Sequence, residues 1–146
     1  MMKDSIRATG EVQIKVYAPN GDLKHEQTIP NLVVTAGKAF IASRMAGVSS
    51  AIMSHMAVGS GSTAADAADT TLGTSLGRVT LSSGTSAGAV ITYVASFPAG
   101  TATGAITEAG IFNDGTTGTM LCRTVFAVVN KGASDALSIT WAITVS

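Results

Sequence analysis

Charged residues are scarce in this sequence. They make up 12% of its 146 residues, whereas a typical soluble domain carries about 25%. Lysine and arginine together number nine, as do aspartate and glutamate, so the formal net charge is +0. Little charge repulsion would keep copies of such a chain apart, and we expect partners to cover much of its surface. Nucleic-acid binding is not expected, because no stretch clusters the basic residues that displace counterions from phosphates.

Cysteine and long apolar runs are also lacking. Cys122 is the single cysteine, which excludes a disulfide within the chain, and we interpret it as a small buried apolar residue. Although 46% of the residues are hydrophobic, no run of about 18 apolar residues occurs, so no membrane-spanning helix is predicted. The first residues lack the apolar block of a signal peptide, which predicts synthesis in a cytosol.

The motifs of catalysis and metal binding are missing as well. His25 and His55 have no Gly-x-Ser-x-Gly elbow to serve, so we interpret both as ordinary strand residues and predict no enzymatic activity. The stretch 59–63 has no lysine to reach a phosphate. Asp66 and Asp69 belong to no calcium-loop pattern, and their spacing suits the capping of a single turn. The sequence therefore predicts no cofactor, no metal and no small-molecule substrate.

What the sequence does contain is a series of short segments typical of strands. Val12, Ile14 and Val16 alternate with polar residues, which is the period of a half-buried strand. The turn formers at 19–22 predict a hairpin that returns over 23–29. Further strands are expected at 78–82, 89–97, 107–112, 120–129 and 136–145, with turns between them, including 83–88. Short strands without repeating helices predict an all-β fold, an antiparallel β-sandwich or jelly-roll-like body.

One short helix is expected at Thr35–Met45, with Thr35 as its N-terminal cap and Gly47 as its end. Residues 1–10 are mixed and polar, so we predict a loose N-terminal arm followed by a single domain over 11–146. The small-residue stretch 59–69 predicts a long loop. Loops of this length inside a compact domain are usually functional.

The segment 113–118 predicts a further hairpin turn. If the loop is symmetric about its middle, Ile111 faces Met120 and Glu108 faces Arg123, which places an acid and a base directly opposite each other. Such a pair would contribute about 0.2–1 kcal/mol and help to set the register.

Trp141 lies in the last predicted strand and shares one face with Ile139, Ile143 and Val145. This position favours a tryptophan that anchors the core. The alternative is an aromatic contact buried between subunits.

Several segments carry a resemblance to a known group of proteins. In order along the chain they are 31–38 (NLVVTAGK), 56–61 (MAVGSG), 106–113 (ITEAGIFN), 123–126 (RTVF), 129–132 (VNKG) and 139–141 (ITW). From about Asn31 onward, the chain resembles small virion proteins of tailed bacteriophages. Some of these resemble head decoration, or capsid cement, proteins, and others are tail-fibre-like or structural. The resemblance implies a β-sandwich or jelly-roll-like body and symmetric oligomers, often trimers, on the capsid surface.

We therefore expect a capsid decoration protein, made in the host cytoplasm and located on the virion surface. Its partners would be other copies of itself, as a trimer, and the major capsid protein. A tail-fibre or baseplate-associated module that binds a host glycan ranks second, because sugar rings stack on exposed aromatics and only 5% of the residues are aromatic. The candidate capsid contacts are the N-terminal arm, with Met1, Ile6 and Arg7, and the 59–72 loop, with Gly59, Gly61, Asp66 and Asp69.

Overall fold

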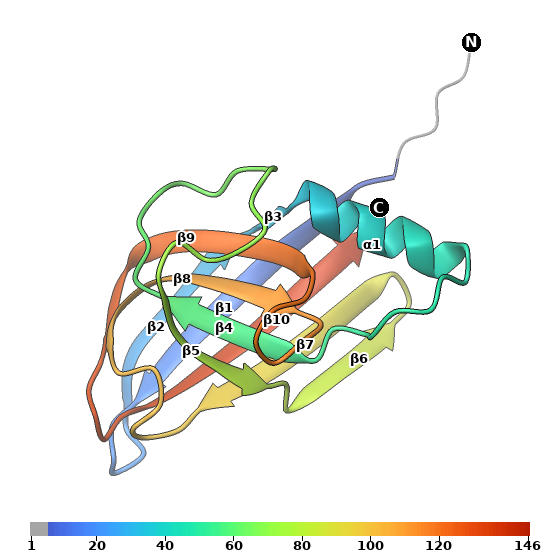
Figure 1. The fold of residues 1–146 in the computed structure, drawn as a ribbon. Helices are drawn as coiled ribbons and strands as arrows, with labels where there is room; N and C mark the ends of the chain where they lie inside the picture. The colour runs from blue at the N-terminus through green and yellow to red at the C-terminus, as the bar shows by residue number, and fades with distance from the viewer. Residues whose placement is uncertain (1–5) are drawn as a thin grey trace.

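The computed structural model describes residues 6–146, which form two five-stranded antiparallel sheets and one helix (Figure 1). The first sheet has the strand order β2-β1-β10-β7-β6 and the second has the order β3-β9-β8-β4-β5. The predicted all-β sandwich with one short helix is thus confirmed. Met1 lies outside the described residues.

The first sheet is built around β1 and β10, which pair without a break from Ala8↔Val145 to Tyr17↔Ala136. The chain alternates buried and half-exposed residues along both strands, so each presents one apolar face to the interior. The strands of this sheet are β1 (Ala8–Tyr17), β2 (Leu23–Pro30), β6 (Ser83–Ala87), β7 (Val90–Phe97) and β10 (Ala136–Val145).

The second sheet is more irregular. Its pairing of β8 with β9 shifts register twice, and its pairing of β4 with β5 shifts once. Its strands are β3 (Leu32–Val33), β4 (His55–Gly59), β5 (Ser75–Thr80), β8 (Gly104–Phe112) and β9 (Met120–Lys131).

The main hydrophobic core lies between the two sheets. Trp141 is 0% exposed there, covered entirely by atoms of its own chain. It therefore anchors the core, and the alternative reading as a contact between subunits is wrong. Other members of this core are Val12, Ile14, Val16, Phe97, Ile106, Ile111, Leu137, Ile139 and Ile143.

Helix α1 spans Thr35–Met45, with the predicted bounds, and lies across one end of the sandwich (Figure 1). Its start differs from the prediction: Val34 is the cap residue, and Thr35 makes no side-chain cap. Instead, the Thr35 N–H donates to the Ala67 carbonyl at 2.8 Å, so a distant loop satisfies the helix start. At the other end, Gly47 has φ +72°, and the N–H groups of Gly47 and Val48 close the last turn.

Two predictions on local structure need correction. Residues 8–10 belong to β1 and not to a loose arm, because β10 is long enough to pair with them. The backbone N–H of Arg7 also donates to the Ser146 carbonyl, at 2.7 Å. Residues 83–87, expected as a turn, form β6. All five are exposed and show no alternation of apolar and polar residues. They form a strand because their backbone pairs with β7.

Candidate functional site

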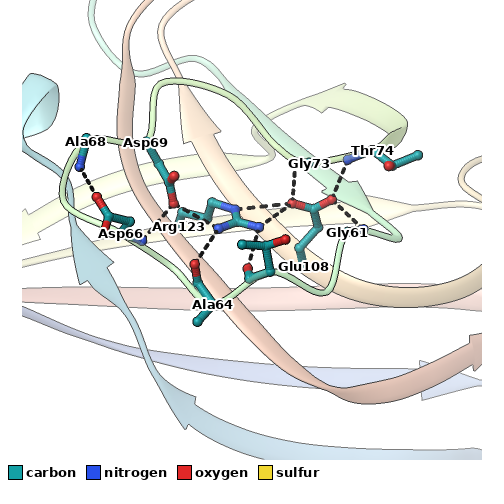
Figure 2. Close-up of polar contacts among 10 residues, drawn as sticks. Gly61, Ala64, Asp66, Ala68, Asp69, Gly73, Thr74, Glu108 and Arg123 are labelled. Atoms are coloured by element: carbon teal, nitrogen blue, oxygen red, sulfur yellow. Dashed lines mark hydrogen bonds and ion pairs between the residues drawn. The ribbon is translucent and has the colours of Figure 1, made fainter.

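The clearest polar cluster of the molecule is centred on Glu108 in β8 and Arg123 in β9, on the outer side of the second sheet (Figure 2). Their side chains form an ion pair with 3.1 Å between Arg123 Nη2 and Glu108 Oε1. Neither is at the surface: the Glu108 side chain is 0% exposed and that of Arg123 is 3% exposed. The sequence identified the pair but not its burial.

The register that brings the pair together differs from the predicted one. Glu108 lies opposite Val125, and Gly110 lies opposite Arg123, so the direct opposition of acid and base was wrong. The shift at these positions is two residues. Because side chains alternate between faces with a period of two, an even shift leaves both residues on the same face, as diagonal neighbours.

The turn at residues 113–119 accounts for one residue of this shift, because Phe112 lies opposite Met120, and an irregularity between Ile111 and Phe112 adds the second. The Asp114 carboxylate accepts hydrogen bonds from the N–H groups of Thr116 and Thr117, both at 2.9 Å. Asn113 closes the turn through the N–H of Thr119, at 2.7 Å. These bonds hold the loop in an asymmetric conformation, unlike the symmetric hairpin that was predicted. They also lower the pKa of Asp114 to about 2.

Glu108 binds both ends of the long loop between β4 and β5. Its Oε2 accepts the backbone N–H of Gly61 at 2.6 Å and that of Thr74 at 2.8 Å, and its Oε1 accepts the N–H of Gly73 at 2.7 Å. Gly61 begins the loop, whereas Gly73 and Thr74 end it. One buried carboxylate therefore binds both ends of the loop, and Arg123 completes its set of partners with two further donors.

Arg123 holds the middle of the same loop. Its Nη2 donates to the Thr63 carbonyl at 3.0 Å, and its Nη1 donates to the Ala64 carbonyl at 3.5 Å and to Asp69 Oδ2 at 2.8 Å. With Nε and Nη2 on Glu108, its donor atoms make five hydrogen bonds, equal to the number of N–H groups on a guanidinium. We call Glu108, Arg123 and Asp69 the clasp.

The electrostatics of Glu108 follow from these partners. Burial alone would raise its pKa, because a carboxylate loses hydration in an apolar setting. The hydrogen bonds from Thr74, Gly73, Gly61 and Arg123 outweigh burial, and the pKa of Glu108 lies below its ordinary value. The side chain is therefore an ionised acceptor at neutral pH.

Below the loop lies a second, smaller apolar cluster on the outer side of the second sheet. Leu72, from the loop, packs there against residues of the sheet, namely Ala57, Phe112 and Met120, and against Val34. Arg78 lies over the ring of Phe112, with its guanidinium carbon 3.8 Å from the ring centre. The loop thus shields apolar surface that the sheet would otherwise expose to water, and the clasp keeps it there.

Two predicted contact residues have a structural role in this arrangement. A Cβ on Gly61 would overlap the carboxylate of Glu108, and a Cβ on Gly59 would overlap the Thr74 carbonyl. Both positions therefore require glycine for the close approach of the loop ends. Gly73 and Thr74, whose N–H groups bind Glu108 of the clasp, were not identified from the sequence. The glycine at 73 was the available signal.

The remaining predicted contact residues fall in two places, the 59–72 loop and the segment that precedes β1. Asp66 is exposed on the loop, where its carboxylate accepts the Ala68 N–H at 2.8 Å. Asp69 is turned inward to Arg123, and its Oδ2 also accepts the Asp66 N–H. Ile6 is 78% exposed and, with Arg7, precedes β1 close to the end of β10.

The other residues considered from the sequence occupy ordinary positions. Cys122 is buried in the main core, and desolvation raises the pKa of its thiol. His25 is half-buried in the edge strand β2, and His55 begins β4, where its Nδ1 lies 2.8 Å from Ser54 Oγ. Within residues 6–146, no three histidine, cysteine or acidic side chains are grouped so as to hold a metal ion.

In the part of the chain that the structure describes, no helix has the length and apolar character needed to span a membrane. Comparison of the chain with protein-family models, curated proteins and solved structures found no match.

Chemically, the clasp is suited to holding structure. The carboxylate of Glu108 and the guanidinium of Arg123 are both buried, and their hydrogen bonds go to the protein's own backbone and side chains. A group that is to bind a ligand or transfer a proton needs a free lone pair or N–H directed toward a cleft. Neither Glu108 nor Arg123 has one directed outward.

Proposed function

We propose that this chain is a structural protein of a tailed-bacteriophage virion, a head decoration protein. It binds the capsid surface between major capsid subunits, in several copies, and stabilises the head. The mechanism is burial of complementary surface at each copy and involves no turnover. After synthesis in the host cytoplasm, the protein would reside on the virion surface.

The observation that carries the proposal is that the buried charges of Glu108 and Arg123 bind backbone groups of the protein itself. Glu108 and Arg123 serve to hold the longest loop against the second sheet, with bonds at the start, middle and end of that loop. This stiffens an exposed surface feature and presents it in one conformation. A preorganised surface loses little conformational entropy on binding, which suits a protein whose task is lasting attachment.

The surface of the loop is compatible with close contact. Asp66, Ala67 and Ala68 are exposed on its outer side, and none of them has a long side chain that would need to be ordered on binding. The resemblance over residues 31–141 points to the capsid as the binding surface. The low content of charged residues favours a protein whose surface is covered in its working state.

The experiment is co-sedimentation of the purified protein with phage heads lacking it, and separately with isolated tails. We expect binding to heads. We also expect Ala68→Arg, which adds a long charged side chain to the exposed part of the loop without touching the clasp, to reduce that binding. Ala99→Arg is the matched control, since Ala99 is also exposed but lies in the turn between β7 and β8. It should bind like the unaltered protein.

Two outcomes would contradict the proposal. Binding to tails and not to heads would assign the chain to the tail, as a fibre or baseplate-associated module. Equal loss of head binding in the Ala68→Arg and Ala99→Arg proteins would show that the loop is not the contact. A reconstruction of the intact particle, with density for the sandwich on the head or on the tail, provides an independent check.

A further inference from the structure

The edge strands of the two sheets differ in how they are protected against pairing with another chain. Edge strand β2 carries Lys24 and Glu26 and ends in Pro30, and edge strand β5 carries Arg78 next to a register shift. Edge strand β3 is only two residues long. Charge, proline, irregularity and shortness are the usual devices that prevent edge-to-edge association.

Edge strand β6 has none of these devices. Its sequence, SGTSA over Ser83–Ala87, contains no charge and no proline, and all five residues are exposed. It pairs with β7 in an unbroken register from Ser83↔Val94 to Ala87↔Val90, so its outer edge is straight. In Figure 1, this edge lies open on the side of the sandwich below α1. A straight, uncharged edge is a ready template for another strand.

The part of the chain that contains β6 and its neighbour β7 is equally free of charge. Between Arg78 and Glu108 the sequence contains no lysine, arginine, histidine, aspartate or glutamate, and this stretch includes both β6 and β7. On the outer face, Thr85 pairs with Thr92, which in turn pairs with Ala142 of β10. Along the edge itself, a partner strand would therefore meet no charge on β6 or β7; the nearest one in the adjoining groove is Arg44 of α1.

We propose that β6 pairs with β6 of a second copy of the chain, antiparallel and edge to edge. The two first sheets then join into one continuous sheet across a two-fold axis. The sequence of β6 is complementary to itself in this arrangement. With the axis at Thr85, that residue faces its own copy, Gly84 faces Ser86, and Ser83 faces Ala87. Cross-strand threonine pairs stabilise a sheet, and a two-fold interface uses the same patch on both subunits.

A second copy is the occupant for two reasons. The formal net charge of +0 provides no long-range repulsion between copies. In addition, the edge continues into a largely apolar groove between β6 and α1, lined by Phe40, Ile52, Ile91 and Tyr93, with Arg44 at its side. Ile52 is 66% exposed there. Pairing of five residues is by itself small against the roughly 1,000 Å² of a specific interface, and the groove supplies apolar surface that enlarges it.

This inference extends the association of copies contained in the proposed function, but it is tested without capsids. It also differs from the trimer that the resemblance implies, because a two-fold pairing yields a dimer. The two proposals can therefore fail separately. A change in mass bears on the pairing, whereas a change in head binding bears on the decoration role.

The test introduces a charge of either sign at Thr85, the residue on the two-fold axis. Thr85→Lys and Thr85→Glu each place two like charges directly opposite each other in the paired strands, which is destabilising. Thr85 is exposed, so neither variant disturbs the core, and far-ultraviolet circular dichroism checks the fold. By light scattering after gel filtration, we expect the unaltered protein to have twice the mass of one chain, and each variant to have the mass of one chain. An equimolar mixture of the two variants should recover the doubled mass.

Thr28→Lys is the matched control, because Thr28 is exposed on the outer face of β2, at the opposite edge of the same sheet. It should dimerise like the unaltered protein. A monomeric or trimeric unaltered protein would overturn the inference. So would retention of the doubled mass by Thr85→Lys, loss of the doubled mass in Thr28→Lys, or failure of the mixed variants to associate.

Discussion

Replacing Glu108 with glutamine tests whether one carboxylate holds the long loop on the sandwich. Glutamine has nearly the same size but only one acceptor oxygen, and its amide N–H₂ must take the place of the other. In one orientation the glutamine N–H₂ group faces the N–H groups of Gly61 and Thr74. In the other it faces those of Gly73 and Arg123. At least two buried donors lose their acceptor in either case, and each such loss costs about 1–3 kcal/mol.

The loss of charge adds to this cost. In the Glu108→Gln protein, the buried guanidinium of Arg123 keeps only Asp69, which is a quarter exposed, as a counter-charge. Removing one partner of a buried ion pair costs about 3–5 kcal/mol in other proteins. We expect a decrease of that size in the free energy of unfolding, which is a large part of the roughly 5–15 kcal/mol available to a domain.

Two measurements check the prediction. Urea unfolding gives the decrease in free energy, and amide hydrogen exchange reports on the N–H groups of Gly61, Gly73 and Thr74, which should exchange much faster in the variant. Glu26→Gln is the matched control, because the exposed carboxylate of Glu26 accepts a single bond, from Gln13 Nε2 at 3.2 Å. Its effect should stay within about 0.5 kcal/mol.

The reasoning is refuted if Glu108→Gln costs less than about 1 kcal/mol or leaves the exchange of these three amides unchanged, because an unsatisfied buried donor alone should exceed that cost. A double-mutant cycle refines the result. Arg123→Met should be destabilising alone, and combined with Glu108→Gln it should cost less than the sum of the two single changes. A coupling energy between about 0.5 and 3 kcal/mol is expected for residues in one network.

The remaining predictions concern the approach of the loop and the response to acid. Gly61→Ala should lower the free energy of unfolding by about 1–3 kcal/mol, since a Cβ there overlaps Glu108, whereas Ser62→Ala on the exposed loop surface should stay within about 0.5 kcal/mol; equal urea midpoints for the two would contradict the close approach. Because the pKa of Glu108 is lower in the folded chain than its ordinary 4.5, the unfolded chain binds more protons in acid, so the contribution of Glu108 is present above pH 4.5 and is lost as the pH falls below it. Urea midpoints between neutral and acid pH should therefore fall more steeply for the unaltered protein than for Glu108→Gln, and parallel profiles would show that Glu108 is not the group responsible.

Much of the fold could be predicted from local patterns. The alternation around Val12, Ile14 and Val16 decided which face of β1 is buried, because side chains in a strand alternate whatever it pairs with. The bounds of α1 followed from the amphipathic stretch and from Gly47, whose positive φ ends the last turn. Position in the final strand, on the apolar face, favoured a place in the core for Trp141, and the structure has it there.

Only the tertiary structure could decide which strands pair, in which register, and which side chains the long loop buries. Strand β6 has no pattern of its own and exists because β7 provides a free edge. The predicted register of β8 and β9 missed by two residues: the turn organised by Asp114 accounts for one, and a register shift between Ile111 and Phe112 adds the other. Because the total shift is even, Glu108 and Arg123 still lie on one face.

The sequence by itself thus determined only that side chains alternate between the two faces along each strand. Glu108 and Arg123 share a face because the register shift is even. The sequence could not determine that both side chains are buried, or that they bind Gly61, Gly73 and Thr74. Those partners lie 34 to 47 positions from Glu108 along the chain. Contacts over such separations depend on where the loop folds back over the sheet, and no local pattern encodes that position.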